Sequence, residues 1–234
     1  MSELRRPDSR QVAAGLGLLA IAVVWPLVSE RLVQSLGVRA LATALLGLGA
    51  VSLVAMRSAI PAELALERTD SLALIALVAG AALTGERLFL LLVPAWLQLA
   101  LFRVFRRSLR VEPTVFERVA RVIEPHAPEF ITPYCRKATA LWSWVFFANA
   151  CAILALAFLA PIAYWRAFAS WIVWVVIAAL SAGDFVVRKI YFRSYHDRPI
   201  DRLLARLFPA ENSEMGRRSN EYRRARRRAL GRAP

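Results

Sequence analysis

The chain has 234 residues, of which 58% are apolar and 21% are charged, and it carries a formal net charge of +14 at pH 7. The apolar share exceeds the roughly 45–50% of ordinary soluble domains, and residues 138–165 contain no Asp, Glu, Lys or Arg. Since a water-soluble helix cannot be apolar on every side for the ~20 residues that a bilayer crossing needs, the composition excludes a soluble enzyme domain, a disordered chain and a secreted disulfide scaffold.

Apolar stretches between charged residues predict an all-α fold, a polytopic membrane protein with six transmembrane helices. The crossings are expected at about 12–29, 38–56, 69–85, 87–104, 139–160 and 167–187. They form a transmembrane domain over 1–192, which is followed by a basic tail over 193–234. Only Glu86 and Arg87 separate the third crossing from the fourth. Five crossings therefore remain an alternative, in which 71–102 is one kinked or re-entrant unit.

Lysine and arginine indicate the orientation of a membrane protein, since they gather on the cytoplasmic side. With six crossings, all but four of the 31 Lys and Arg residues fall on the side that holds both termini. The four on the other side are Arg31, Arg39, Arg87 and Arg166. We therefore expect both termini, and the tail, in the cytoplasm. An odd number of crossings would spread the large basic segments over both faces.

A short amphipathic helix is predicted over 114–124, in the cytoplasmic loop between the fourth and fifth crossings. Thr114 and Glu117 match the capping-box pattern, and Pro125 ends the helix. Glu117 can pair with Arg121 one turn later. The apolar residues of one helical face are Val115, Phe116, Val119, Val122 and Ile123. This face is expected to lie in the inner-leaflet interface; the alternative is that it packs on the helix bundle.

The basic tail is expected to be helical. Its first part carries an apolar face made of Ile200, Leu203, Leu204, Leu207 and Phe208. Its second part holds the arginines Arg217, Arg218, Arg223, Arg224, Arg226, Arg227 and Arg228. Each basic side chain near an anionic leaflet contributes about 1 kcal/mol to binding. We therefore expect these arginines to contact anionic lipid headgroups, and we favour this interpretation over a ribosome or nucleic-acid contact.

Two polar residues are predicted inside the late crossings. Asp184 is the only carboxylate within its crossing, and Arg188 lies one turn later on the same helical face. An intramembrane acid is a functional candidate by default, but the cost of burial falls toward the ends of a crossing. We favour a structural Asp184–Arg188 pair over a proton relay. Asn149 lies well inside the fifth crossing and is expected to hydrogen-bond another helix.

Tryptophans lie near both expected membrane surfaces. Trp142 and Trp144 are close to the inner end of the fifth crossing, and Trp165 and Trp171 flank the outer turn. Since tryptophan is enriched at membrane–water interfaces, we expect these four residues to form interfacial belts.

The sequence offers little ligand chemistry. Cys135, Cys151 and the two histidines do not stand at a metal-ligand spacing. His126, beside Glu124 and Glu129, is interpreted as a solvated loop residue. We find no phosphate-binding glycine loop, nucleophile elbow or paired histidine–carboxylate set in the sequence. The sequence thus predicts no cofactor, no metal and no catalytic residue, and it favours a protein that is not an enzyme.

One set of residues carries a family resemblance. The set is Phe116-Glu117-Arg118-Val119-Ala120-Arg121, Pro125, Tyr134-Cys135-Arg136-Lys137-Ala138-Thr139, Trp142, Phe146-Phe147, Asn149, Trp165 and Gly183-Asp184 with Arg188. It resembles the uncharacterised bacterial inner-membrane proteins encoded within aryl-polyene and xanthomonadin-type pigment clusters. A fainter similarity, through the Trp-x₃-Phe-Phe run, reaches the intracellular septation protein A family. Both resemblances imply a bacterial inner-membrane protein of envelope biogenesis.

The candidate functional polar cluster consists of Tyr134, Arg136, Lys137, Thr139, Asn149, Asp184 and Arg188. Our leading hypothesis is a non-catalytic accessory or scaffold protein for envelope lipid or aryl-polyene-type pigment biosynthesis. Its partners would be membrane lipids with anionic headgroups, and cytoplasmic biosynthetic enzymes or an acyl carrier protein. The alternative is a small transporter or flippase for a lipid-like product, with Asp184, Asn149 and the basic pair Arg136–Lys137 along a polar path. A membrane-embedded acyl or prenyl transferase comes third, because Asp184 lacks the second carboxylate or histidine that such chemistry needs.

Overall fold

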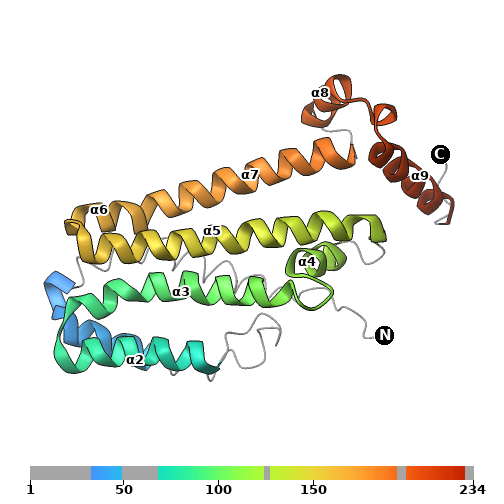
Figure 1. Cartoon of the computed structure of the whole chain (residues 1–234). Coiled ribbons are helices and arrows are strands. Elements are labelled where there is room, and N and C mark those ends of the chain that lie inside the picture. The colour runs from blue at the N-terminus through green and yellow to red at the C-terminus, as the bar shows by residue number, and fades with distance from the viewer. Residues whose placement is uncertain (1–32, 49–67, 124–126, 194–198, 230–234) are drawn as a thin grey trace. The chain divides into compact units, whose positions relative to one another are not determined.

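The computed structural model describes residues 33–48, 68–123, 127–193 and 199–229 (Figure 1). Within these ranges every regular element is a helix and none is a strand, which confirms the all-α prediction for this part of the chain. The elements are the helix Val33–Leu48, α2 (Arg68–Thr84), α3 (Arg87–Ser108), α4 (Val115–Ile123), η1 (Glu129–Ile131), α5 (Thr132–Leu159), α6 (Ile162–Ala167), η2 (Phe168–Ile172), α7 (Val173–Phe192), α8 (Pro199–Leu207), η3 (Ala210–Asn212) and α9 (Glu214–Ala229). The predicted crossing at 12–29, part of that at 38–56, and His126 lie outside the described residues.

Three helical stretches of the described part are long and apolar enough to cross a membrane, namely Arg87–Ser108, Glu129–Leu159 and Ile162–Phe192. Few of their side chains are buried within the chain, so their apolar surfaces face outward. A hydrocarbon core ~30 Å thick suits helices of this length. The protein therefore has the character of a membrane protein. Val33–Leu48 and Thr69–Thr84 are apolar but shorter.

Helices α2 and α3 form an antiparallel hairpin and lie side by side (Figure 1). The turn passes through Gly85, whose φ of 76° is readily adopted only by glycine. Gly80 lets the two helices approach closely, since a Cβ atom there would stand 3.0 Å from the ring of Phe89. Residues 71–102 are thus two helices folded back on each other, and not one kinked helix.

Helix α3 packs on its other side against α5 (Figure 1). The rings of Phe105 and Phe146 lie 5.0 Å apart, centroid to centroid, and those of Phe102 and Phe147 lie 5.1 Å apart. The buried residues of α5 are Cys135, Ala138, Thr139, Trp142, Ser143, Phe146, Asn149, Ala150 and Ile153. Their spacing of three and four residues places them on one face of the helix. The inward surface of α5 is therefore a single stripe in which three polar side chains interrupt the apolar ones.

Two expectations for this region need correction. The three prolines Pro125, Pro128 and Pro133 predict an irregular segment up to Tyr134, but α5 begins at Thr132. Pro133 falls in the first turn of this helix, where its missing N–H leaves no hydrogen bond unmade. The prediction that four tryptophans form interfacial belts also fits only two of them. Trp144 and Trp171 are exposed, whereas Trp142 and Trp165 are each 7% exposed and pack inside the chain.

The chain divides into two compact units, residues 1–174 and 175–234. The boundary falls within one continuous helical stretch, Ile162–Phe192. Near its start, η2 is a π-helix, and the N–H of Val173 bonds the carbonyl of Phe168, five residues earlier. An α-helix bonds residues four apart, so η2 is a local widening of the turn.

Candidate functional site

The structure separates the members of the predicted polar cluster that lie on α5. Thr139 and Asn149 belong to the buried stripe, and the hydroxyl of Thr139 donates a 2.7 Å hydrogen bond to the carbonyl of Cys135. Arg136 and Lys137 are exposed and lie off that stripe. Asn149 lies thirteen residues beyond Arg136, about 20 Å along the helix. A polar path that joins the basic pair to Asn149 is therefore not formed by α5. Tyr134 is half-buried.

Asn149 does not make the expected hydrogen bond through its amide nitrogen. Its side chain is buried, and Nδ2 has no hydrogen-bond partner in the described part of the chain. The Nε1 atom of Trp165 and the hydroxyl of Ser170, both buried, are likewise without one there. Trp165 and Ser170 lie in α6 and η2, directly after the turn that ends α5. An unpaired polar group is costly in an apolar interior, and bound water commonly satisfies such groups.

Asp184 and Arg188 lie on α7, in the second unit. Asp184 is half-buried, and Arg188 is exposed with its guanidinium carbon 6.0 Å from the centroid of the Phe185 ring. The Asp184–Arg188 pair stays a prediction. Asn149 belongs to the first unit.

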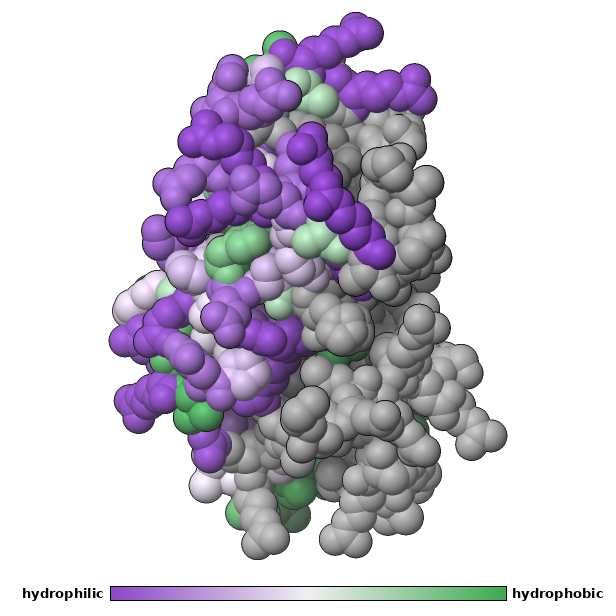
Figure 2. All heavy atoms as spheres, turned by 90° about the vertical axis from the view of Figure 1, so that its right-hand side faces the viewer, coloured by the Kyte–Doolittle hydropathy of each residue, from purple (hydrophilic) through white to green (hydrophobic). Residues whose placement is uncertain are grey.

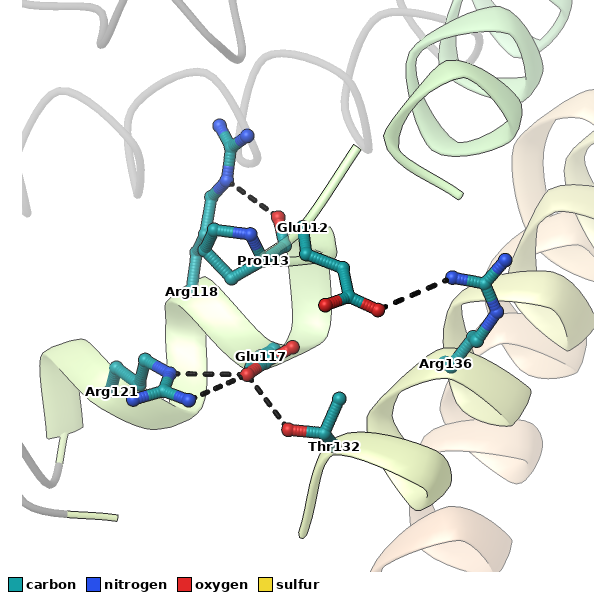
Figure 3. A network of polar contacts seen from close by, with 7 residues as sticks. All are labelled: Glu112, Pro113, Glu117, Arg118, Arg121, Thr132 and Arg136. Atoms are coloured by element: carbon teal, nitrogen blue, oxygen red, sulfur yellow. Dashed lines mark hydrogen bonds and ion pairs between the residues drawn. The ribbon is translucent and has the colours of Figure 1, made fainter. Parts of the chain in front are cut away.

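The best-defined polar site of the first unit is the contact between α4 and α5 (Figure 3). The Glu117 carboxylate accepts hydrogen bonds from Arg121, 2.7 Å to Nη2 and 3.2 Å to Nε, which confirms the predicted pair. The hydroxyl of Thr132 donates to the same oxygen over 2.9 Å. Because Thr132 is the first residue of α5, one carboxylate joins the two helices.

The protonation of Glu117 reflects two opposing effects. Burial raises the pKa of this carboxyl, whereas the hydrogen bonds from Arg121 and Thr132 and the charge of Arg121 lower it, and the net result lies below the ordinary value of 4.5. The backbone N–H of Thr114 also bonds the carboxylate. The predicted capping box is therefore half formed, because the Thr114 hydroxyl is buried without a hydrogen-bond partner among the described residues.

The remaining polar contacts of this region lie at its surface (Figure 3). Nε of Arg118 donates to the carbonyl of Pro113 over 2.9 Å. Nη1 of Arg136 lies 3.9 Å from Oε1 of Glu112, and both side chains are largely exposed. An exposed pair at this distance contributes little to stability. Arg136, from the predicted cluster, thus faces the loop that precedes α4.

The apolar face of α4 packs partly on the bundle, as the alternative prediction had it. Val115 is buried, and the Phe116 ring lies 6.1 Å from that of Phe105 and 6.3 Å from that of Trp142. Val119 remains 47% exposed. The first turn of α4 is therefore part of the protein core, and the expectation that the whole face lies in the lipid interface is wrong for that turn.

A second polar site joins α2 to α3, and sequence reasoning missed it. Asp70, in the first turn of α2, is 1% exposed, and its carboxylate pairs with Arg103 of α3. Nε1 of Trp96 donates to the backbone carbonyl of Asp70 over 3.2 Å, and the Arg103 guanidinium carbon lies 4.6 Å from the Trp96 ring centroid. The sequence does indicate this contact. If the chain folds back at Gly85, Asp70 lies within one helical turn of Arg103.

The arginine-rich segment of the tail is a helix, α9. It begins with a side-chain cap, since the hydroxyl of Ser213 accepts a 3.0 Å hydrogen bond from the N–H of Gly216. The Arg218–Glu214 pair, at 2.6 Å, supports its first turn. Among the arginines of the predicted lipid-contact set whose side chains the structure describes, Arg217, Arg218, Arg224 and Arg228 are exposed. Figure 2, which includes α8 and α9, shows mostly hydrophilic side chains among the residues that it colours.

The described residues contain no group of three or more His, Cys, Asp or Glu side chains that could hold a metal ion. The buried acids Asp70 and Glu117 are both paired with arginine. A carboxylate held in such a pair is not a free base for proton transfer. Comparison with known proteins adds no relative, because no family model, curated protein or solved structure matches the chain.

Proposed function

We propose that the chain is a non-catalytic accessory or scaffold protein of the bacterial inner membrane, with six crossings and both termini in the cytoplasm. The distribution of Lys and Arg supports this orientation. The hairpin of α2 and α3 supports an even number of crossings, since it returns the chain to the side from which it came. The resemblance of its sequence supports a role in envelope lipid or aryl-polyene-type pigment biosynthesis.

One observation favours a scaffold over an enzyme. The best-buried charged groups of the described part are Asp70 and Glu117, and each is held in contacts that join two helices. Asp70 pairs with Arg103 across α2 and α3, whereas Glu117 pairs with Arg121 within α4 and accepts a hydrogen bond from Thr132 of α5. An enzyme of this size would be expected to hold at least one positioned acid or base free for substrate. These groups stabilise a platform, and the exposed arginines of α9 supply its cytoplasmic contact surface.

The surface of α9 suits two kinds of partner. Anionic lipid headgroups would hold the tail against the membrane, with about 1 kcal/mol from each basic side chain near the leaflet. Cytoplasmic biosynthetic enzymes or an acidic acyl carrier protein would use the same charge. The protein would in this way keep lipid-linked intermediates or an assembly line at the membrane.

Deletion of the gene, followed by analysis of envelope lipid and pigment, tests the proposal. We expect loss of product, restored by the full chain and only partly restored by a chain that lacks residues 214–229. A variant with the α9 arginines replaced by lysine is the matched control, since it keeps the charge and should restore product. An unchanged envelope would contradict the role in biosynthesis.

The second candidate is a transporter or flippase, and the unpaired amide of Asn149 favours it. A polar group without a partner inside a membrane-crossing helix can bind a polar part of a passing substrate. In that case the deletion strain should accumulate product in the inner leaflet. Asn149→Leu should then abolish transport at normal protein abundance, whereas the scaffold would tolerate it.

A further inference from the structure

We propose that Arg106 and the aromatic rings beside it bind one anionic phospholipid, with the phosphate on the guanidinium and an acyl chain on the rings. Arg106 lies in the last turn of α3 and is exposed. Its guanidinium carbon lies 5.5 Å from the centroid of the Trp144 ring. Among the described residues no carboxylate pairs with Arg106, whereas Arg103, one turn earlier, is neutralised by Asp70.

The rings form a triangle that spans α3 and α5. We call Phe102, Trp144 and Phe147 the ring triangle. Its centroid distances are 6.2 Å from Phe102 to Trp144, 5.1 Å from Phe102 to Phe147 and 5.8 Å from Trp144 to Phe147. Trp144 is 53% exposed and Phe147 is 37% exposed. The contacts hold the rings in place while their outer faces stay open.

Apolar surface continues from the ring triangle along α5. Leu154 and Phe158, seven and eleven residues after Phe147 and therefore on the same face of the helix, are 36% and 61% exposed. Leu154 lies ten residues after Trp144, about 15 Å along the helix. This length matches one leaflet, which is half of a hydrocarbon core ~30 Å thick. The site therefore has a cation at its end and an apolar strip leading away from it.

This combination selects a lipid with a negatively charged headgroup. A guanidinium can bind two phosphate oxygens at once, and its contact with the Trp144 ring holds the fork in place. Tryptophan prefers the depth at which headgroups meet acyl chains. A soluble phosphate compound would use only the cation and leave the apolar strip uncovered. The inference needs α3 and α5 to cross a membrane, and it is independent of the biosynthetic role proposed above.

Native mass spectrometry of the full-length protein in a non-ionic detergent tests the site. The protein is titrated with phosphatidylglycerol, with phosphatidylethanolamine of the same acyl chains, and with water-soluble glycerol 3-phosphate. Arg106→Gln is compared with Arg110→Gln, an exposed arginine four residues later. Trp144→Leu is compared with Trp171→Leu, which removes a tryptophan of similar exposure. Binding by α9 contributes equally to all four variants.

We expect phosphatidylglycerol to bind more tightly than phosphatidylethanolamine, and glycerol 3-phosphate to compete weakly. Arg106→Gln should weaken the first phosphatidylglycerol by about tenfold, since a charged hydrogen-bonding group is lost, while Arg110→Gln retains it. Trp144→Leu should weaken binding and Trp171→Leu should not. Equal losses in the two arginine variants, equal affinity for the two lipids, or full competition by glycerol 3-phosphate would each overturn the proposal. If Arg106→Gln does not fold, Arg106→Lys against Arg110→Lys decides, with a loss expected only in the first.

Discussion

The hydroxyl of Thr132, the first residue of α5, donates a 2.9 Å hydrogen bond to the carboxylate of Glu117 in α4. The same oxygen accepts two hydrogen bonds from Arg121. Glu117 is almost fully buried, so the loop between α3 and α5 is fastened to the bundle through a carboxylate that water scarcely reaches.

Glu117→Gln should lower the free energy of unfolding by roughly 1–3 kcal/mol, because Arg121 and Thr132 lose a charged acceptor. The folded pKa of Glu117 lies below its ordinary value, so this stabilisation is fully present above the ordinary value and is lost as pH falls through the lowered pKa. Thermal unfolding in detergent between pH 7 and pH 3 measures it. The difference between wild type and variant should shrink at the acid end.

Glu112→Gln is the matched control for that experiment. Glu112 meets Arg136 at 3.9 Å with both side chains exposed, so its removal should change stability little. If the two glutamine variants lose the same stability, the α4–α5 contact is not held by Glu117.

Arg103→Ala should destabilise the protein more than Asp70→Asn does. Removing the arginine leaves a buried carboxylate without its partner, a change that costs about 3–5 kcal/mol, whereas asparagine leaves no charge behind. The double variant should recover part of the loss. A double-mutant cycle by thermal unfolding measures the coupling, and strictly additive losses would show that the two side chains do not depend on each other.

The proposed topology predicts which positions a membrane-impermeant thiol reagent can reach. In a variant without Cys135 and Cys151, single cysteines at 31, 87 and 166 should be labelled in intact cells. Single cysteines at 112 and 212 should be labelled only after the cells are opened. Labelling at 112 from outside would contradict the model of six crossings with both termini inside.

The tail should bind membranes through charge. A peptide of residues 200–230 should bind vesicles rich in anionic lipid and leave them as salt rises, since the Debye length shrinks from ~10 Å at 0.1 M to ~3 Å at 1 M. Neutral vesicles should retain weak binding through the apolar residues of α8. Equal and salt-insensitive binding to both vesicle types would refute electrostatic attachment. Tighter binding to RNA than to anionic lipid would indicate that the tail contacts nucleic acid instead.

Asp184→Asn should leave function nearly intact, while Arg188→Ala should reduce stability. Asparagine can still donate and accept hydrogen bonds locally, whereas loss of Arg188 would remove the predicted partner of a carboxylate near the membrane interior. Complementation of the deletion strain, together with protein abundance, measures both effects. Loss of function in Asp184→Asn at normal abundance would assign Asp184 a transport or chemical role.

Charge placement located the turn between α2 and α3. The apolar runs on either side of Glu86 and Arg87 match these two helices, because a charged side chain inside a crossing is costly. The turn after α5 lies at residues 160–161, a few residues before Arg166. The start of α5 was not predicted, because three prolines close together favour an irregular segment, whereas Pro133 falls in the first turn of α5, where proline is tolerated. The Glu117–Arg121 pair was predictable because it depends only on spacing within one helix.

Contacts between helices were harder to predict. The Asp70–Arg103 pair depends on how two helices meet across a turn, and sequence periodicity describes each helix alone. Trp142 and Trp165 were assigned to interfacial belts by residue type, but packing against neighbours decided their burial. Arg136 and Asn149 were grouped in one polar cluster because the sequence does not show which face of α5 points inward. In the structure Asn149 lies on the buried stripe and Arg136 lies outside it.

The π-helix Phe168–Ile172 holds one more residue than an ordinary α-helical turn. Each residue of an α-helix turns the chain by about 100°, and the bond from Val173 to Phe168 absorbs one residue more than an ordinary turn. Deleting one residue from this segment would remove that additional residue and let the turn close to the ordinary width, with α-helical hydrogen bonds on both sides. A change of one residue in the length of the chain can therefore be accommodated within Phe168–Ile172.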